Sequence, residues 1–151
     1  MIPLKLPQYN LNIKQSEGKS SVFDIIRKKY VALTREEWVR QNFIHFLIEE
    51  KNYPQSLISV EYSLKLLKMH KRSDIVLFDN QGSPRVIVEC KAPEIKISQD
   101  TFDQAARYNM SLKVDYLIVS NGLDHYCCKI NYEKESYEFL TDVPDYSLIR
   151  G

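Results

Sequence analysis

The stretch of sequence that decides the fold is DIVLFDNQGSPRVIVECKAP, which runs from Asp74 to Pro93. It contains two apolar runs, 75–78 and 86–88, that are rich in the β-branched residues favoured in strands. The segment between them, residues 79–84, is dense in turn-forming residues. We therefore predict a β-hairpin with two antiparallel strands.

Charged side chains lie at the open end of this predicted hairpin. Antiparallel pairing brings Asp74, at the start of the first strand, near Glu89, at the end of the second. Because side chains alternate along a strand, Glu89 and Lys91 point to one side and Cys90 to the other. The pattern alone also fits a surface salt bridge, but here it ends the most apolar strand of the chain. Two carboxylates and a lysine at one point are what a divalent metal and an activated water require.

The composition indicates one ordinary globular domain. The chain has 151 residues, of which 44% are hydrophobic and 27% charged. Its apolar runs are too short for a transmembrane helix, and its N-terminus lacks the apolar region of a signal peptide. The three cysteines do not make a disulfide framework, so we expect a reduced, cytoplasmic protein with no membrane partner.

The net charge is +1, which is low for a strong nucleic-acid binder. Two basic groups nevertheless stand out, 27–29 and the group formed by Lys65, Lys68, His70, Lys71 and Arg72. Either group could contact phosphates or belong to a solvated turn, and the sequence leaves both readings open.

Two helices are predicted around the hairpin. A capping box formed by Thr34 and Glu37 predicts a helix from Arg35 to about Glu50. A second helix is expected from Ser98, its N-cap, to about residue 112. Its residues Gln104 and Tyr108 are four positions apart and therefore share a face.

The remaining elements complete an α/β fold. We predict strands at 58–64, 74–78, 86–91 and 116–119, and a C-terminal hairpin from 125–130 and 137–140. The strand at 116–119 should be parallel to its partner because a helix precedes it. The expected architecture is an αβββαβ core with a mixed central sheet flanked by helices. We expect a single domain over 1–151, in which residues 1–20 form an extended arm or a short hairpin.

These segments together resemble a known family. The helix with EEWVRQ (36–41), the pair formed by Asp74 and ECKAP (89–93), and the helix with QAARYN (104–109) resemble the PD-(D/E)xK nuclease superfamily. More narrowly, they are similar to the N-terminal endonuclease domain of the type I restriction enzyme R subunit. The likeness extends from residue 23 to residue 122 and so covers nearly the whole chain, as a small stand-alone version with a restriction-endonuclease-like fold.

The resemblance implies a Mg²⁺-dependent (or Mn²⁺-dependent) DNA endonuclease that acts in restriction-modification or a related defence. Asp74, Glu89 and the carbonyl of Cys90 would hold the metal, since Mg²⁺ takes few protein ligands. Lys91 would orient the attacking water and offset charge in the transition state. Glu37 would be the acid on the first helix, with Glu36 as the competing choice.

The resemblance also implies partners. Gln104 and Tyr108 would contact the DNA backbone or brace the site. Ser73 replaces the proline of the superfamily name. We expect a stand-alone domain without the helicase or translocase part of an R subunit. Activity would therefore depend on that motor or another restriction subunit, or on a homodimer that cuts both strands. The alternative is a non-catalytic module that keeps the fold to bind DNA or a protein.

Overall fold

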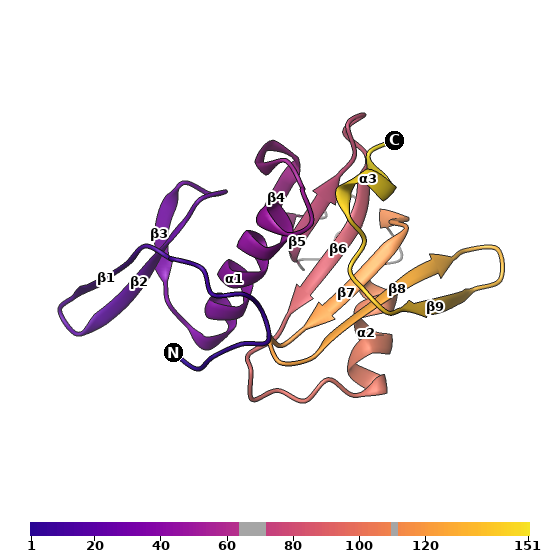
Figure 1. The fold of residues 1–151 in the computed structure, drawn as a ribbon. Helices are drawn as coiled ribbons and strands as arrows, with labels where there is room; N and C mark the ends of the chain where they lie inside the picture. The colour runs from indigo at the N-terminus through magenta and orange to yellow at the C-terminus, as the bar shows by residue number, and fades with distance from the viewer. Residues whose placement is uncertain (64–71, 110–111) are drawn as a thin grey trace.

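The computed structural model describes residues 1–63, 72–109 and 112–151, with only the backbone described at 62–63, 72–73 and 108–109. Figure 1 shows a small sheet at one side of a larger sheet that carries the helices. The elements, in chain order, are β1 (Ile13–Ser16), β2 (Lys19–Asp24), β3 (Lys29–Ala32), α1 (Arg35–Glu49), the 3-10 helix η1 (Gln55–Leu57), β4 (Ile58–Ser63), β5 (Arg72–Phe78), β6 (Pro84–Cys90), α2 (Gln99–Asn109), β7 (Tyr116–Ser120), β8 (His125–Asn131), β9 (Ser136–Leu140) and α3 (Tyr146–Ile149).

The larger sheet has six strands in the order β4-β5-β6-β7-β8-β9. β6 and β7 are parallel, and every other neighbouring pair is antiparallel. The parallel pair exists because the chain crosses over through α2 between the two strands. The predicted mixed α/β architecture is confirmed, and β8 and β9 pair as the expected C-terminal hairpin. The hairpin β8–β9 extends the central sheet.

Two apolar clusters cover the two faces of this sheet. On one face Val39, Phe43, Ile44 and Leu47 of α1 pack against alternate residues of the strands, such as Ile75, Val88 and Ile118. On the other face Phe102, Ala105 and Ala106 of α2 pack against the intervening residues, such as Val76, Ile87 and Leu117. The central strands β5, β6 and β7 each contain a run of successive apolar residues because both faces of the sheet are covered there.

The first 33 residues contain more structure than the sequence predicts. β1 and β2 form a hairpin around Glu17 and Gly18, whose φ angles of 53° and 76° fit the two-residue turns common in hairpins. β3 adds a third antiparallel strand. The sequence allowed for the hairpin but not for β3, and it also missed η1 and α3. These elements are four residues or fewer, so periodicity carries little signal for them.

Helix α1 begins where predicted, but half of the capping box is replaced. Thr34 accepts a hydrogen bond from Glu37 N at 3.0 Å, as an N-cap does. The Glu37 carboxylate is engaged instead by Arg27, Arg40 and Gln41. Charged donors bind a carboxylate more strongly than a backbone N–H does.

Among the described helices, none is long and apolar enough to cross a membrane.

Candidate active site

Asp74 and Glu89 lie together at the open end of the β5–β6 hairpin. Ile75 pairs with Val88, which places the two acids at the next position of the ladder. The Cys90 N–H donates to Asp74 Oδ2 at 2.7 Å and fixes that carboxylate against the end of β6. The predicted convergence of Asp74 with the Glu-Cys-Lys segment is therefore present in the structure.

Lys91 lies on the same side as Glu89. Its Nζ is 3.4 Å from Glu89 Oε1, and its side chain is one-third exposed, whereas Glu89 is buried. The Cys90 side chain points the other way, into the cluster beneath α1. Lys91 is therefore held beside the acids while its ammonium group remains accessible to a ligand.

Helix α1 contributes a second acid and an arginine that joins the two elements. Arg40 Nη1 lies 2.6 Å from Glu37 Oε1, and Arg40 Nη2 lies 2.7 Å from Asp74 Oδ1. Glu36 also contacts Arg40 Nη2, at 3.2 Å, but its side chain is 48% exposed. Of the two helix acids, Glu37 is the one buried within the site.

The network continues into the turn after β2. Arg27 contacts Asp24 at 2.6 Å, Glu37 at 3.1 Å and Glu61 of β4 at 3.3 Å. The Gln41 amide donates to both Asp24 and Glu37. Glu61 takes a left-handed φ of 55° at the point where β4 passes Asp74.

Sequence reasoning missed Asp24, Arg27, Arg40 and Gln41 as parts of this site. The spacing of 37, 40 and 41 along one helix was a signal, because residues three and four apart share a face. For Asp24 and Arg27 the signal was weaker. Their contact with α1 depends on how the β2–β3 turn packs against the helix.

Among the described side chains, the site has more negative than positive charges. Its six carboxylates are Asp24, Glu36, Glu37, Glu61, Asp74 and Glu89, and its three cations are Arg27, Arg40 and Lys91. Six against three leaves a formal charge of −3 on these groups. Burial raises the pKa of Asp74 above its usual range, outweighing Arg40 and the Cys90 N–H, while Glu89 raises it further. Burial disfavours the charged form of the Asp74 carboxylate, and a cation bound to it would stabilise that form, so Asp74 is a suitable ligand for a metal ion.

The donor set fits Mg²⁺ in one specific way. Within the described ranges, no group of three or more His, Cys, Asp and Glu side chains is arranged to hold a metal ion. Mg²⁺, however, is commonly held by one or two carboxylates and keeps several waters. Asp74 and Glu89 supply two carboxylates, and a carboxylate has about four lone-pair positions. Gln41 Oε1, buried and without a hydrogen-bond partner among the described residues, is a further oxygen in the same network.

The predicted pair on α2 is not brought to this site by the described contacts. Gln104 is exposed, on the side of α2 turned away from Phe102, Ala105 and Ala106. The Tyr108 side chain lies outside the described part of the chain, as do residues 65–71 of the basic group and the Arg72 side chain. The structure thus joins Asp74, Glu89, Lys91 and Glu37 but leaves Gln104 apart.

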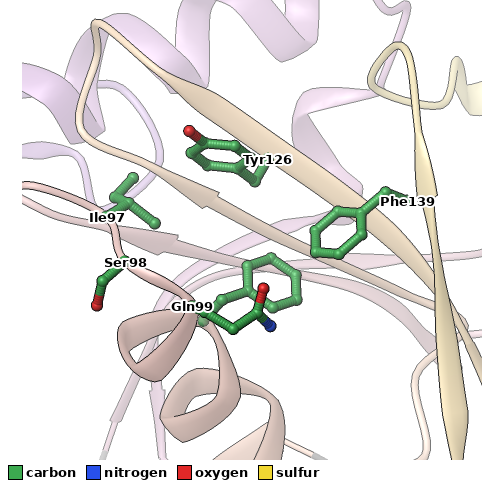
Figure 2. A pocket seen from close by; sticks show the side chains of 6 residues that line it. Ile97, Ser98, Gln99, Tyr126 and Phe139 are labelled. Atoms are coloured by element: carbon green, nitrogen blue, oxygen red, sulfur yellow. The ribbon is translucent and has the colours of Figure 1, made fainter.

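A shallow groove of about 180 Å³ lies on the α2 face of the sheet (Figure 2). It is lined by Ile97, Ser98, Gln99, Phe102, Tyr126 and Phe139. Tyr126 pairs with Val119, which pairs with Glu89, so the groove lies two strands from the acids. None of these lining side chains is charged, so the groove does not supply the ionisable groups of the candidate site.

The fold and the site define a mixed α/β protein with buried carboxylates at one end of its sheet. Its structure is similar to a fragment of a protein assigned as an HsdR subunit of a type I restriction enzyme from Vibrio vulnificus YJ016. The TM-score is 0.55 at 21% sequence identity, which shows a likeness of fold. The similarity covers 76% of this chain and 24% of that one, so this chain corresponds to about a quarter of that structure.

The sequence then gives the family. The chain belongs to the family described as type I restriction enzyme R protein N terminus (HSDR_N), whose sequence model matches residues 35–144. The match begins at α1 and includes Asp74, Glu89 and Lys91, while β1–β3 precede it. The predicted relationship to the R subunit is therefore confirmed. Comparison with curated proteins gives no significant match.

Proposed function

We propose that this chain is a metal-dependent endonuclease of the PD-(D/E)xK superfamily, with a restriction-endonuclease-like core, that hydrolyses DNA phosphodiester bonds. The observation that carries the proposal is the position of Asp74, Glu89 and Lys91 at one end of a buried hairpin. Membership of the type I restriction R-protein family supports a task in restriction-modification or a related defence.

Asp74 and Glu89 are the residues that would hold Mg²⁺ or Mn²⁺, together with the carbonyl of Cys90. The metal would supply Lewis-acid stabilisation and a water that loses its proton more easily. Lys91 remains partly exposed beside Glu89, where its ammonium group offsets negative charge that grows on a phosphate during attack. Glu37 fixes Arg40, and Arg40 in turn orients Asp74.

The outer face of α2 extends the proposal toward the substrate. Gln104 is exposed there, with an amide free to approach a sugar–phosphate backbone. Tyr108, four residues further along the chain, is the second residue of this proposed contact. In this proposal the active assembly is completed by a motor, by another restriction subunit or by a second copy of the chain.

The test is nicking of supercoiled plasmid in Mg²⁺ or Mn²⁺ by the wild type and Lys91→Ala. We expect metal-dependent nicking that falls by about 10² or more in the variant, the scale on which a charge-stabilising group acts. Lys96→Ala, which removes an exposed lysine five positions away, serves as the matched control. Equal nicking by Lys91→Ala and wild type would refute this assignment.

A non-catalytic module that binds DNA or protein is the second candidate, and one observation favours it. Arg40 already places a positive charge between Glu37 and Asp74, as a purely structural network would. Absence of both nicking and divalent-metal binding in the wild type would support this second function.

A further inference from the structure

We propose that the three-stranded sheet β1–β3, here called the basic sheet, binds the phosphate backbone of duplex DNA beside the candidate site. The inference rests on the proposed function and adds a surface formed by residues that come before the family match in the sequence. Figure 1 shows the basic sheet standing at one side of the six-stranded sheet, next to the start of α1.

The charge of the basic sheet differs from that of the rest of the chain. Residues 13–32 contain five lysines and arginines and two acids, a formal charge of +3. The whole chain carries +1, so the remainder carries −2. Phosphates approaching a site with a surplus of carboxylates are repelled, and a neighbouring cationic surface offsets that repulsion.

The pairing of the strands places lysines on the outer face of the basic sheet. Lys14 pairs with Ser21, Lys19 with Ser16 and Tyr30 with Phe23, which puts Lys14, Lys19 and Tyr30 on one face. Val22 and Asp24, on the opposite face, are fully buried. The lysine face is therefore the one turned away from the body of the protein.

Contacts within the basic sheet position Lys14 and the turn between β2 and β3. Lys14 Nζ lies 4.3 Å from the centroid of the Tyr30 ring, a cation–π contact. The turn between β2 and β3 is held by Asp24 Oδ1, which accepts hydrogen bonds from the Ile26 and Arg27 backbone N–H groups. Lys28 and Lys29, at the end of this turn, are exposed. A cation such as Lys14 that is positioned before binding loses less side-chain entropy when it binds a phosphate.

The basic sheet is joined directly to the candidate site. Arg27 in its turn contacts Glu37, and Arg40 joins Glu37 to Asp74. DNA phosphates bound by Lys14 and Lys19 would lie on the outer face of the basic sheet, whose turn is connected to the Asp74 carboxylate through Arg27, Glu37 and Arg40.

The experiment measures binding of a fluorescein-labelled 20-base-pair DNA duplex in EDTA by anisotropy, over a series of NaCl concentrations. The full chain is compared with Lys14→Gln/Lys19→Gln and with Lys129→Gln/Lys134→Gln. The second variant removes the same charge from two exposed lysines of the β8–β9 hairpin region. Lys14→Arg/Lys19→Arg keeps the charge, and thermal melts verify that each variant is folded.

Loss of two phosphate contacts should weaken binding at least about fivefold and reduce the slope of log K against log[salt] by about two. The control pair and the arginine pair should keep the wild-type affinity and slope. Equal weakening by both glutamine pairs, no weakening by either, or no duplex binding by the wild type would each overturn the proposal. A different result would separate the two proposals. If nicking depends on metal and is lost only in Lys91→Ala, while Lys14→Gln/Lys19→Gln binds DNA normally, the DNA-binding surface is wrong and the proposed nuclease function stands.

Discussion

Arg40 and Asp74 are joined by a short ion pair in which Arg40 Nη2 lies 2.7 Å from Asp74 Oδ1. The same guanidinium contacts Glu37 at 2.6 Å, so one arginine connects α1 to β5 at the candidate site. Burial would lower the pKa of Arg40, but Asp74 and Glu37 outweigh it and keep the group charged. Arg40 therefore neutralises part of the site and also fixes the position of the acid most central to the proposal.

Replacing Arg40 should destabilise the protein strongly. Arg40→Gln leaves Glu37 and Asp74 without their shared cation, and removing one partner of a buried ion pair costs about 3–5 kcal/mol. Urea unfolding measures this loss. Arg35→Gln, which breaks an ion pair with Glu94 between side chains that are 71% and 50% exposed, should change stability by at most about 1 kcal/mol. Similar losses in the two variants would contradict the assigned role of Arg40.

The two neighbouring acids on α1 should behave differently. Glu37→Gln weakens contacts with Arg27, Arg40 and Gln41 and should lower both stability, by about 2 kcal/mol, and any metal-dependent activity. Glu36→Gln, at a half-exposed position, should leave both nearly unchanged. Unfolding curves and plasmid nicking by the two variants show which of the two glutamates is the helix acid of the site. A larger effect from Glu36→Gln would make Glu36 the helix acid.

Asp24 should contribute a pH-dependent part of the stability. Burial alone would raise its pKa, but hydrogen bonds from Arg27 and Gln41, with the charge of Arg27, lower it below the ordinary 3.8. The folded state thus binds this proton less readily than the unfolded state. The stabilisation is present above about pH 4 and is lost as the pH falls through the lower folded value.

The pH effect is measured as the difference in unfolding free energy between wild type and Asp24→Asn. We expect the wild type to be the more stable protein at pH 7, and the difference to shrink below pH 4. A difference that stays constant from pH 7 to pH 2 would show that the Asp24 charge is not what stabilises the turn.

Divalent metal should stabilise the wild type through Asp74 and Glu89. At ten times its Kd, Mn²⁺ adds about 1.4 kcal/mol, which for a chain of this size raises Tm by roughly 3–6 °C. Asp74→Asn and Glu89→Gln should abolish this rise in a thermal melt. Glu94→Gln, an exposed acid in the loop after β6, should retain it. A Mn²⁺-induced rise in Tm that survives in both site variants would place the metal elsewhere.

The hairpin that carries the site was predictable because its signals are local. Two apolar runs around a turn-rich segment specify strands, register and the meeting of Asp74 with Glu89, since all of these follow from the period of two. The helix α1 was equally predictable from its cap and apolar stripe. The outward position of Gln104 was not predictable from the sequence, because the packing of α2 on the sheet decides which residues of the helix are buried.

By itself, then, the sequence determined the mixed α/β architecture and the family, because periodicity, caps and motifs are properties of neighbouring residues. Only the tertiary structure decided that Arg27 and Arg40 join Asp24, Glu37, Glu61 and Asp74 in one network. The pairs Arg27–Asp24 and Arg40–Glu37 are local, but the contacts of Arg27 with Glu61 and of Arg40 with Asp74 link residues 34 positions apart, the latter between α1 and β5. These long-range contacts form only when the chain folds. Burial then makes the pairing of the charges energetically necessary, because an unpaired charge in that position would be too costly to keep.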